Sequence, residues 1–178
     1  SNAQKIDKKQ TITRTEINKI IDNHTRDFML LEPALATSLN LDEQVGGDYA
    51  KRLPDYSSAG LISLQKTLTN AIAQLDKIDT EGLSDKDKLH INVNRVIDEY
   101  FLGDTSFSGG YIDTWGGHLP YIVNQISGPL IDIPTVLKDQ HAVNSELDAA
   151  NYILRLEALP VLVEQVLSKV KDDEKKGI

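Results

Sequence analysis

The chain has 178 residues, enough for one domain with its own hydrophobic core, and it contains no cysteine, which excludes disulfide bonds. Its 27 acidic and 19 basic residues give a formal net charge of -8, which disfavours binding to the phosphate backbone of nucleic acid. The most apolar stretch, 159–167, is interrupted by Pro160, Glu164 and Gln165, whereas a membrane-spanning helix needs about 20 apolar residues. We therefore expect no nucleic-acid partner and no membrane span.

The two ends of the chain suggest a piece of a larger protein. Residues 1–3, Ser-Asn-Ala, resemble the remnant of a cleaved affinity tag, so the natural sequence is expected to begin at Gln4. At the other end, Gly177 is a residue type that ends helices, and no further element follows it. We expect residues 4–178 to form a single helical domain, the amino-terminal fragment of a longer chain.

Apolar residues recur at three- and four-residue intervals over most of the chain, which predicts amphipathic helices. The first predicted helix begins at a capping box formed by Thr13 and Glu16 and ends before Pro33. The second follows the turn at 53–57. The residues on one face are Ile17, Ile20, Ile21, His24, Phe28 and Leu31 in the first helix and Leu61, Leu64, Leu68, Ile72, Leu75 and Ile78 in the second.

Two further helices are predicted towards the carboxyl end. One starts at Ser84 and Asp87 and ends at Gly103, while the other starts near Ser145 and contains Pro160, which should kink it or split it in two. We expect their apolar faces to be Leu89, Val93, Val96, Ile97 and Tyr100 in the former and Leu147, Ala150, Ile153, Leu154, Val163, Val166, Leu167 and Val170 in the latter.

Helical periodicity fails between residues 103 and 145, where glycine doublets and prolines indicate a long loop. Loops of more than about 15 residues are uncommon in compact domains and are more often functional or packed against another part. Within this loop, 131–137 is expected to add a short helix, and 111–115 or 121–126 to be extended. The predicted fold class is all-α, an antiparallel, bundle-like array of helices with one long irregular loop (about 103–145) that has room for a short β-hairpin.

The search for catalytic motifs is negative. The histidines, at positions 24, 90, 118 and 141, are separated by 66, 28 and 23 residues, and neither a His-Glu-x-x-His pattern nor a cysteine ligand is present. No glycine doublet is followed by the Lys-Ser/Thr pair of a phosphate-binding loop, and no Gly-x-Ser-x-Gly motif occurs. We assign no catalytic residue and no metal ligand to this sequence.

The candidate substrate-binding residues are four side chains of the long loop, Trp115, His118, Tyr121 and Gln125. They are candidates because binding groups concentrate in loops. The alternative for the two aromatic residues is to pin the loop onto the core, since large rings bury much apolar area, and for His118 and Gln125 it is to stabilise turns. Arg155 lies in a mainly apolar helix and is expected to pair with an internal carboxylate or with loop carbonyls.

Five short motifs, taken in order, resemble the bacterial family DUF885, a domain of unknown function. The motifs are Pro-Ala-Leu-Ala-Thr at 33–37, Leu-Pro-Asp-Tyr-Ser at 53–57, Leu-Asp-Lys-Ile-Asp at 75–79, Leu-Pro-Tyr at 119–121 and Asn-Tyr-Ile-Leu-Arg-Leu-Glu-Ala-Leu-Pro at 151–160. Members of this family are much longer, are similar to helical zinc peptidases of the gluzincin type and are often exported as lipoproteins. No catalytic residue of the family maps onto this sequence.

The resemblance implies a function for the whole protein rather than for these residues. Zinc is expected in the carboxy-terminal part, on a His-Glu-x-x-His helix, with no cofactor in this part of the chain. The implied partners are the remainder of the same chain and peptides, and the implied location is the periplasm, either free or anchored by a lipid attached upstream, with the cytoplasm as the other option. The alternative hypothesis is a free-standing helical module that binds a ligand or a protein and has no catalytic activity.

Overall fold

The computed structural model describes residues 12–41, 48–107 and 109–178 and has an all-α fold with one short β-hairpin, which confirms the predicted fold class. The helices are, in chain order, α1 (Arg14–Leu31), α2 (Pro33–Ser38), the 3-10 helix η1 (Tyr49–Lys51), α4 (Ser58–Asp76), α5 (Asp85–Leu102), α6 (Pro129–Asp139) and α7 (Glu146–Lys175). The hairpin pairs β1 (Tyr111–Asp113) with β2 (Gly117–Leu119) in antiparallel orientation. No described helix is both long and apolar enough to span a membrane.

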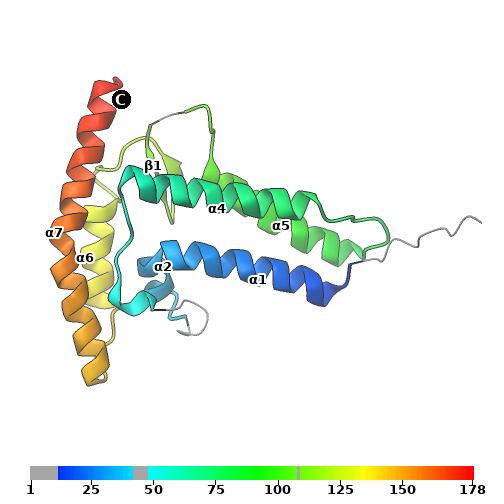
Figure 1. The fold of residues 1–178 in the computed structure, drawn as a ribbon, viewed down its shortest axis with the longest axis horizontal. Helices are drawn as coiled ribbons and strands as arrows, with labels where there is room; N and C mark the ends of the chain where they lie inside the picture. The colour runs from blue at the N-terminus through cyan, green and yellow to red at the C-terminus, as the bar shows by residue number, and fades with distance from the viewer. Residues whose placement is uncertain (1–11, 42–47, 108) are drawn as a thin grey trace, which may run out of the picture.

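The helices form two groups that run in different directions (Figure 1). Figure 1 shows α1, α4 and α5 side by side, with α4 antiparallel to the other two, and α7 standing across the end where α1 finishes and α4 begins. Each group has its own core: Leu68 of α4 packs with Leu102 and Ile112, whereas Leu162 of α7 packs with Ile133 of α6. The hairpin and α2 lie at the junction between the two groups.

Side-chain caps set the helix starts, as the sequence predicts. The Glu16 N–H donates to the Thr13 hydroxyl at 3.2 Å, and the Thr13 N–H donates to the Glu16 carboxylate at 2.7 Å, which confirms the capping box. Ser84 caps α5 and Ser145 caps α7 by accepting from the backbone N–H three residues later. Because Pro33 disfavours helical geometry in the residue before it, α1 ends at Leu31 and Pro33 opens α2.

The expected apolar face of α5 does not face the core. Its members, Leu89, Val93, Val96, Ile97 and Tyr100, are 46–61% exposed, whereas Ile91 and Leu102 are buried. Helix α5 packs against α4, α1 and the hairpin, and these contacts leave the expected face uncovered. The prediction was wrong because α5 has apolar residues on more than one side, and spacing alone does not say which side is covered.

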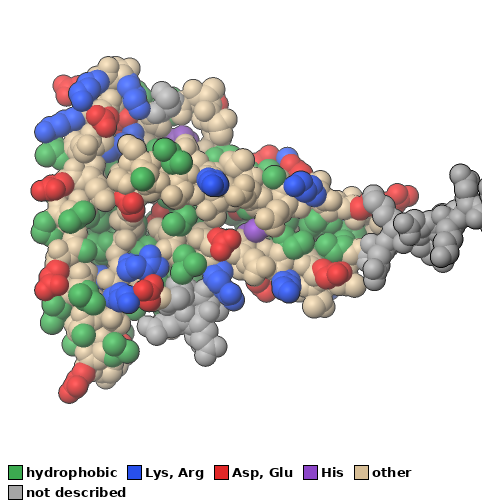
Figure 2. Space-filling view, in the orientation of Figure 1, with side chains coloured by type: hydrophobic (Ala, Val, Ile, Leu, Met, Phe, Trp, Pro, Cys, Tyr) green, Lys and Arg blue, Asp and Glu red, His purple; other side chains and the backbone are tan. Residues whose placement is uncertain are grey.

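The expected apolar face of α7 is also wrong, with Val166 as its one buried member. The buried side of α7 instead consists of Asn151, Arg155, Leu162, Val166 and Asp173. Four exposed apolar residues, here called the α7 ridge, flank this side at spacings of seven, four and three residues: Leu156, Val163, Leu167 and Val170. They are 39–51% exposed, and Figure 2 shows hydrophobic side chains on the outer surface of α7 among acidic ones.

Proline 160 does not split α7, which runs unbroken from Glu146 to Lys175. A proline inside a helix removes one backbone hydrogen bond, but the buried residues Arg155 and Leu162 anchor the helix on both sides of the proline.

The long loop has more structure than expected. Helix α6 is longer than the predicted 131–137, the 111–115 segment supplies β1, and 121–126 has no strand.

Candidate functional site

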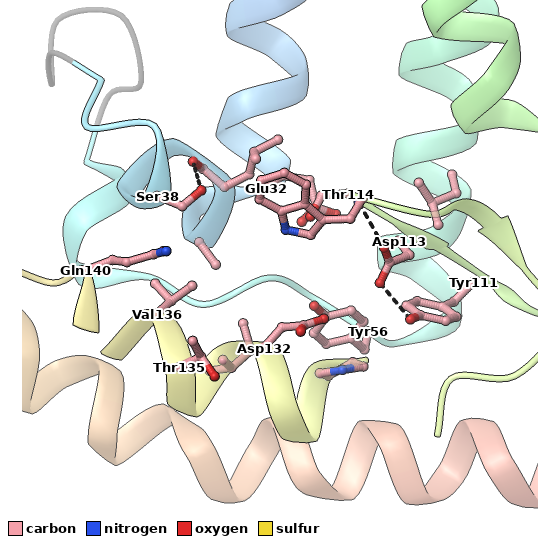
Figure 3. Close-up of a pocket in the computed structure, with 16 residues that line it drawn as sticks. Glu32, Ser38, Tyr56, Tyr111, Asp113, Thr114, Asp132, Thr135, Val136 and Gln140 are labelled. Atoms are coloured by element: carbon pink, nitrogen blue, oxygen red, sulfur yellow. Dashed lines mark hydrogen bonds between the residues drawn. The ribbon is translucent and has the colours of Figure 1, made fainter. Parts of the chain in front are cut away.

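A cavity of about 90 Å³ lies where the end of α1, the hairpin and α6 meet. Its wall combines three carboxyl groups with three aromatic rings, those of Glu32, Asp113, Asp132, Tyr56, Tyr111 and Trp115. Figure 3 shows the labelled Glu32, Asp113 and Asp132 around the same space, each carried by a different element. Among the described residues that line the cavity, none is a lysine or an arginine.

Glu32 sits at the junction of α1 and α2. Its N–H donates to the Phe28 carbonyl at 3.0 Å, as in a helix, but its backbone then leaves helical geometry because Pro33 follows. The residue is only 3% exposed, and no described residue donates a hydrogen bond to its carboxyl group. A buried acid without donors is unusual, since most buried polar groups are hydrogen-bonded.

Asp113 is held in the opposite way, with both carboxylate oxygens engaged. One accepts from the backbone N–H groups of Trp115 at 2.8 Å and Gly116 at 2.6 Å, and the other accepts from the Tyr111 hydroxyl at 2.8 Å. These bonds shape the three-residue turn of the hairpin, which closes at Gly117 with a φ of 74°. Asp113 is therefore a buried carboxyl group that accepts three hydrogen bonds.

Asp132 lies in the first turn of α6 and supports its start. Its carboxylate accepts from the Gly128 N–H at 2.9 Å. Gly128 has a φ of 108°, and a Cβ there would lie 2.6 Å from the Ile122 carbonyl oxygen, so this turn requires glycine. Burial, and less strongly the charge of Asp113, raise the pKa of Asp132, while the hydrogen bond from Gly128 acts in the opposite direction.

The electrostatics of the cavity are dominated by burial of acids close together. Burial, and then the nearby charge of Asp113, raise the pKa of Glu32 to about 8, so this carboxyl group is mostly protonated at neutral pH. Burial is also the main cause that raises the pKa of the Tyr56 and Tyr111 hydroxyls, with further contributions from Asp113 and Asp132. The site thus favours whatever lowers its negative charge, a proton or a cation.

The structure separates the four candidate residues named from the sequence. Trp115 lines the cavity and is 72% exposed, so it stands at the cavity's edge. Both ring nitrogens of His118 lie 3.0 Å from backbone carbonyls, those of Leu102 and Gly109, and His118 therefore ties the loop to α5. Tyr121 and Gln125 are exposed and do not line the cavity.

Sequence reasoning missed the three carboxyl groups of the cavity. They are 81 and 19 residues apart, and no motif links them. The sequence did hold a partial signal, because each of the three acids lies next to residues that mark the end of an element. Glu32 precedes a proline, Asp113 precedes a Trp-Gly-Gly turn, and Asp132 follows a Gly-Pro pair. Among the residues that the structure describes, no three His, Cys, Asp or Glu side chains are placed to hold a metal ion.

Residues 33–178 match the sequence profile of DUF885, described as a bacterial protein of unknown function. The chain belongs to this family. Its fold is similar to the crystal structure of a protein described as "the putative lipoprotein from Colwellia psychrerythraea", with a TM-score of 0.87 and 27% sequence identity. The similarity covers 93% of this DUF885 chain and 29% of the Colwellia protein, so the chain spans less than a third of that protein's length. A search of curated proteins gave no match.

Proposed function

We propose that this chain is the amino-terminal helical part of an exported zinc metallopeptidase and forms one wall of its substrate cleft. The zinc ligands and the catalytic glutamate would lie in the carboxy-terminal part. There the metal would polarise the scissile carbonyl and activate water. The similarity of the longer DUF885 members to gluzincin-type zinc peptidases supports the activity, and the description of the Colwellia protein as a lipoprotein supports export.

The observation that carries the scaffold role is the α7 ridge, considered together with the length of the similar protein. Leu156, Val163, Leu167 and Val170 expose an apolar strip next to the buried side of α7. Exposed apolar surface arranged in a continuous strip is typical of an interface. This chain corresponds to 29% of the Colwellia protein, so we expect the downstream part of the same polypeptide to pack against the strip.

The exposed apolar side of α5 supports the same role. Its residues, among them Val93, Ile97 and Tyr100, lie on the helix group that α7 does not cover. Two uncovered apolar surfaces on different helix groups fit a part that is enclosed by a larger protein. This chain would contribute to peptide hydrolysis through the shape and the charge of the cleft wall. The acidic cavity lies at the junction of the two groups of helices.

The proposal is tested by comparing the 178-residue chain with a longer product of the same gene. Zinc content is measured by mass spectrometry and peptide hydrolysis with a mixture of fluorogenic peptides. We expect stoichiometric zinc and hydrolysis in the longer product and neither in the shorter chain. Stoichiometric zinc in the shorter chain, or a longer product without zinc, would overturn the proposal.

A free-standing binding module is the second candidate. The acidic cavity favours it, because the described residues of this chain already form a cavity with three carboxyl groups and three aromatic rings. The two candidates differ in the gene: a reading frame that stops at Ile178 supports the module and contradicts the peptidase, whereas one that continues into a His-Glu-x-x-His helix supports the peptidase.

A further inference from the structure

We infer that the acidic cavity binds an organic cation, an ammonium or guanidinium group, with Glu32, Asp113 and Asp132 as the counter-charges and Trp115 at its edge. This inference is independent of peptide hydrolysis elsewhere in the protein, because it rests on residues of this chain alone.

The first argument is the state of Glu32. Its side chain is nearly completely buried and lines the cavity, yet it accepts no hydrogen bond from the described residues. Among the described residues, every side-chain oxygen or nitrogen that is fully buried has a hydrogen-bond partner. The Glu32 carboxyl oxygens have no such partner among these residues, so they are not fully buried and open onto the cavity that Glu32 lines. A buried polar group without a partner is costly, and a donor placed in the cavity removes that cost.

The second argument is the sign of the charge. Glu32, Asp113 and Asp132 come from three different parts of the fold and converge on one small space (Figure 3), and no described residue that lines it is basic. Ionised carboxylates so close together destabilise one another, which favours the protonated form of Glu32, and an added cation would favour the ionised form of all three. A neutral ligand would supply hydrogen bonds but would leave this repulsion in place.

The third argument is size and shape. A volume of about 90 Å³ accommodates a small group such as the head of an alkylammonium or a guanidinium ion. The rings of Tyr56, Tyr111 and Trp115 add aromatic faces, which attract such cations. The carboxyl groups are not arranged as a set of three metal ligands, so the geometry favours an organic cation over a metal ion.

Binding should be linked to proton release. The groups that face Glu32 are Asp113 and Tyr111 of β1, Asp132 of α6 and Tyr56 before α4. Burial, and then the charge of Asp113, disfavour the ionised form of Glu32, which is why its pKa lies near 8. A bound cation favours the ionised carboxylate, and complex formation at pH 7 should therefore release a proton.

The test is isothermal titration calorimetry of the 178-residue chain with n-butylammonium and with guanidinium, each in two buffers that differ in ionisation enthalpy. We expect binding of at least one cation with proton release, and an affinity lower by roughly tenfold to a hundredfold in E32Q. The matched control is E81Q, at an exposed glutamate in the connection between α4 and α5, which should bind like the parent chain.

Three results would overturn the inference. The first is that neither cation binds at concentrations up to about 10 mM. The second is that n-butanol binds as tightly as n-butylammonium, and the third is that E32Q binds the cation with the same affinity as the parent chain. Circular dichroism verifies that E32Q is folded, and D132N is a second variant with the same expected direction. If the Trp115 ring contacts the cation, the affinity of a Trp115→Ala variant should be lower by about threefold or more.

The cation has two possible sources, a free amine or guanidine compound and a lysine or arginine of the downstream part of the chain. Titration of the longer product distinguishes them. Equal binding to both products identifies a free ligand. Binding to the 178-residue chain only, lost in the longer product, identifies a side chain that already occupies the cavity.

Discussion

The Nη2 atom of Arg155 lies 3.2 Å from the carbonyl oxygen of Pro33, so α7 is bonded to the backbone that directly follows Glu32 of the acidic cavity. Arg155 is fully buried, and its other partners are the carbonyls of Tyr49 and Arg52, the Thr37 hydroxyl and Nδ1 of His141. No carboxylate among the described residues bonds to it. Arg155 instead pairs with backbone carbonyls, of which that of Arg52 lies in a loop and those of Pro33 and Tyr49 lie in α2 and η1. Burial lowers its pKa to about 10.

We predict that Arg155→Met destabilises the chain by about 3 kcal/mol or more. The loss leaves the carbonyls of Pro33, Tyr49 and Arg52 without their donor in a buried position, and each such group costs about 1 kcal/mol or more. Urea denaturation measures the free energy of unfolding. The control Arg14→Met removes an exposed ion pair with Asp87 and should change little. Equal stability of the two variants would show that the network is not structural.

Leu68→Ala should cost roughly 2 to 5 kcal/mol, because Leu68 is 2% exposed in the core between α4 and the hairpin. The control on the same helix is Ile62→Ala, at a residue that is 62% exposed, where the change should stay near zero. Thermal unfolding of both variants measures the difference. Identical melting curves would contradict the assignment of this face to the core.

The buried Glu32 should make the chain less stable as pH rises. Its folded pKa of about 8 lies above the ordinary 4.5, so the folded state holds the proton more tightly than the unfolded state. This contribution is fully favourable below about pH 4.5 and is lost between about 4.5 and 8, with a slope of at most about 1.4 kcal/mol per pH unit. We expect the free energy of unfolding, measured by urea denaturation at several pH values, to depend less on pH in E32Q than in the parent chain. At pH 8 we expect E32Q to be the more stable of the two. Parallel profiles would mean that Glu32 is ionised in the fold.

The α7 ridge should matter only in the longer product. Changing Val163 and Leu167 together to serine removes apolar surface that is already exposed in the 178-residue chain, so its stability should change little. In the longer product we expect a loss of roughly 2 kcal/mol or more, because the same residues would then be buried. Ile62→Ser is the control in both products. A small effect in the longer product would show that the downstream part does not cover the ridge.

Local signals in the sequence were enough to predict where helices begin and end. The capping box at Thr13, the serine cap at Ser84 and the glycine at Gly103 are settled by groups within a few residues of one another. Short-range hydrogen bonds act the same way in any tertiary setting. The stripe on α4 was also correct, because that helix is apolar mainly on one side.

The acidic cavity was not predictable in this way. Of the four residues chosen from the long loop, Trp115 alone lines it, and the three carboxyl groups come from the junction of α1 and α2, from β1 and from α6. Each carboxylate has a plausible local role, such as the turn that Asp113 shapes or the helix start that Asp132 supports. Their convergence depends on the way α6 and the hairpin pack against the end of α1, and no local pattern records that packing.

The sequence alone determined the all-α class, the family motifs and most helix starts, because these depend on periodicity and on contacts between near neighbours. The tertiary structure decided which side of α5 and α7 is covered and which acids meet. Burial is a property of neighbouring elements: Val166 and Leu167 are adjacent and similarly apolar, yet one is in the core and the other is half exposed. The same dependence leaves Glu32 beside Asp113, where burial rather than residue type sets its charge.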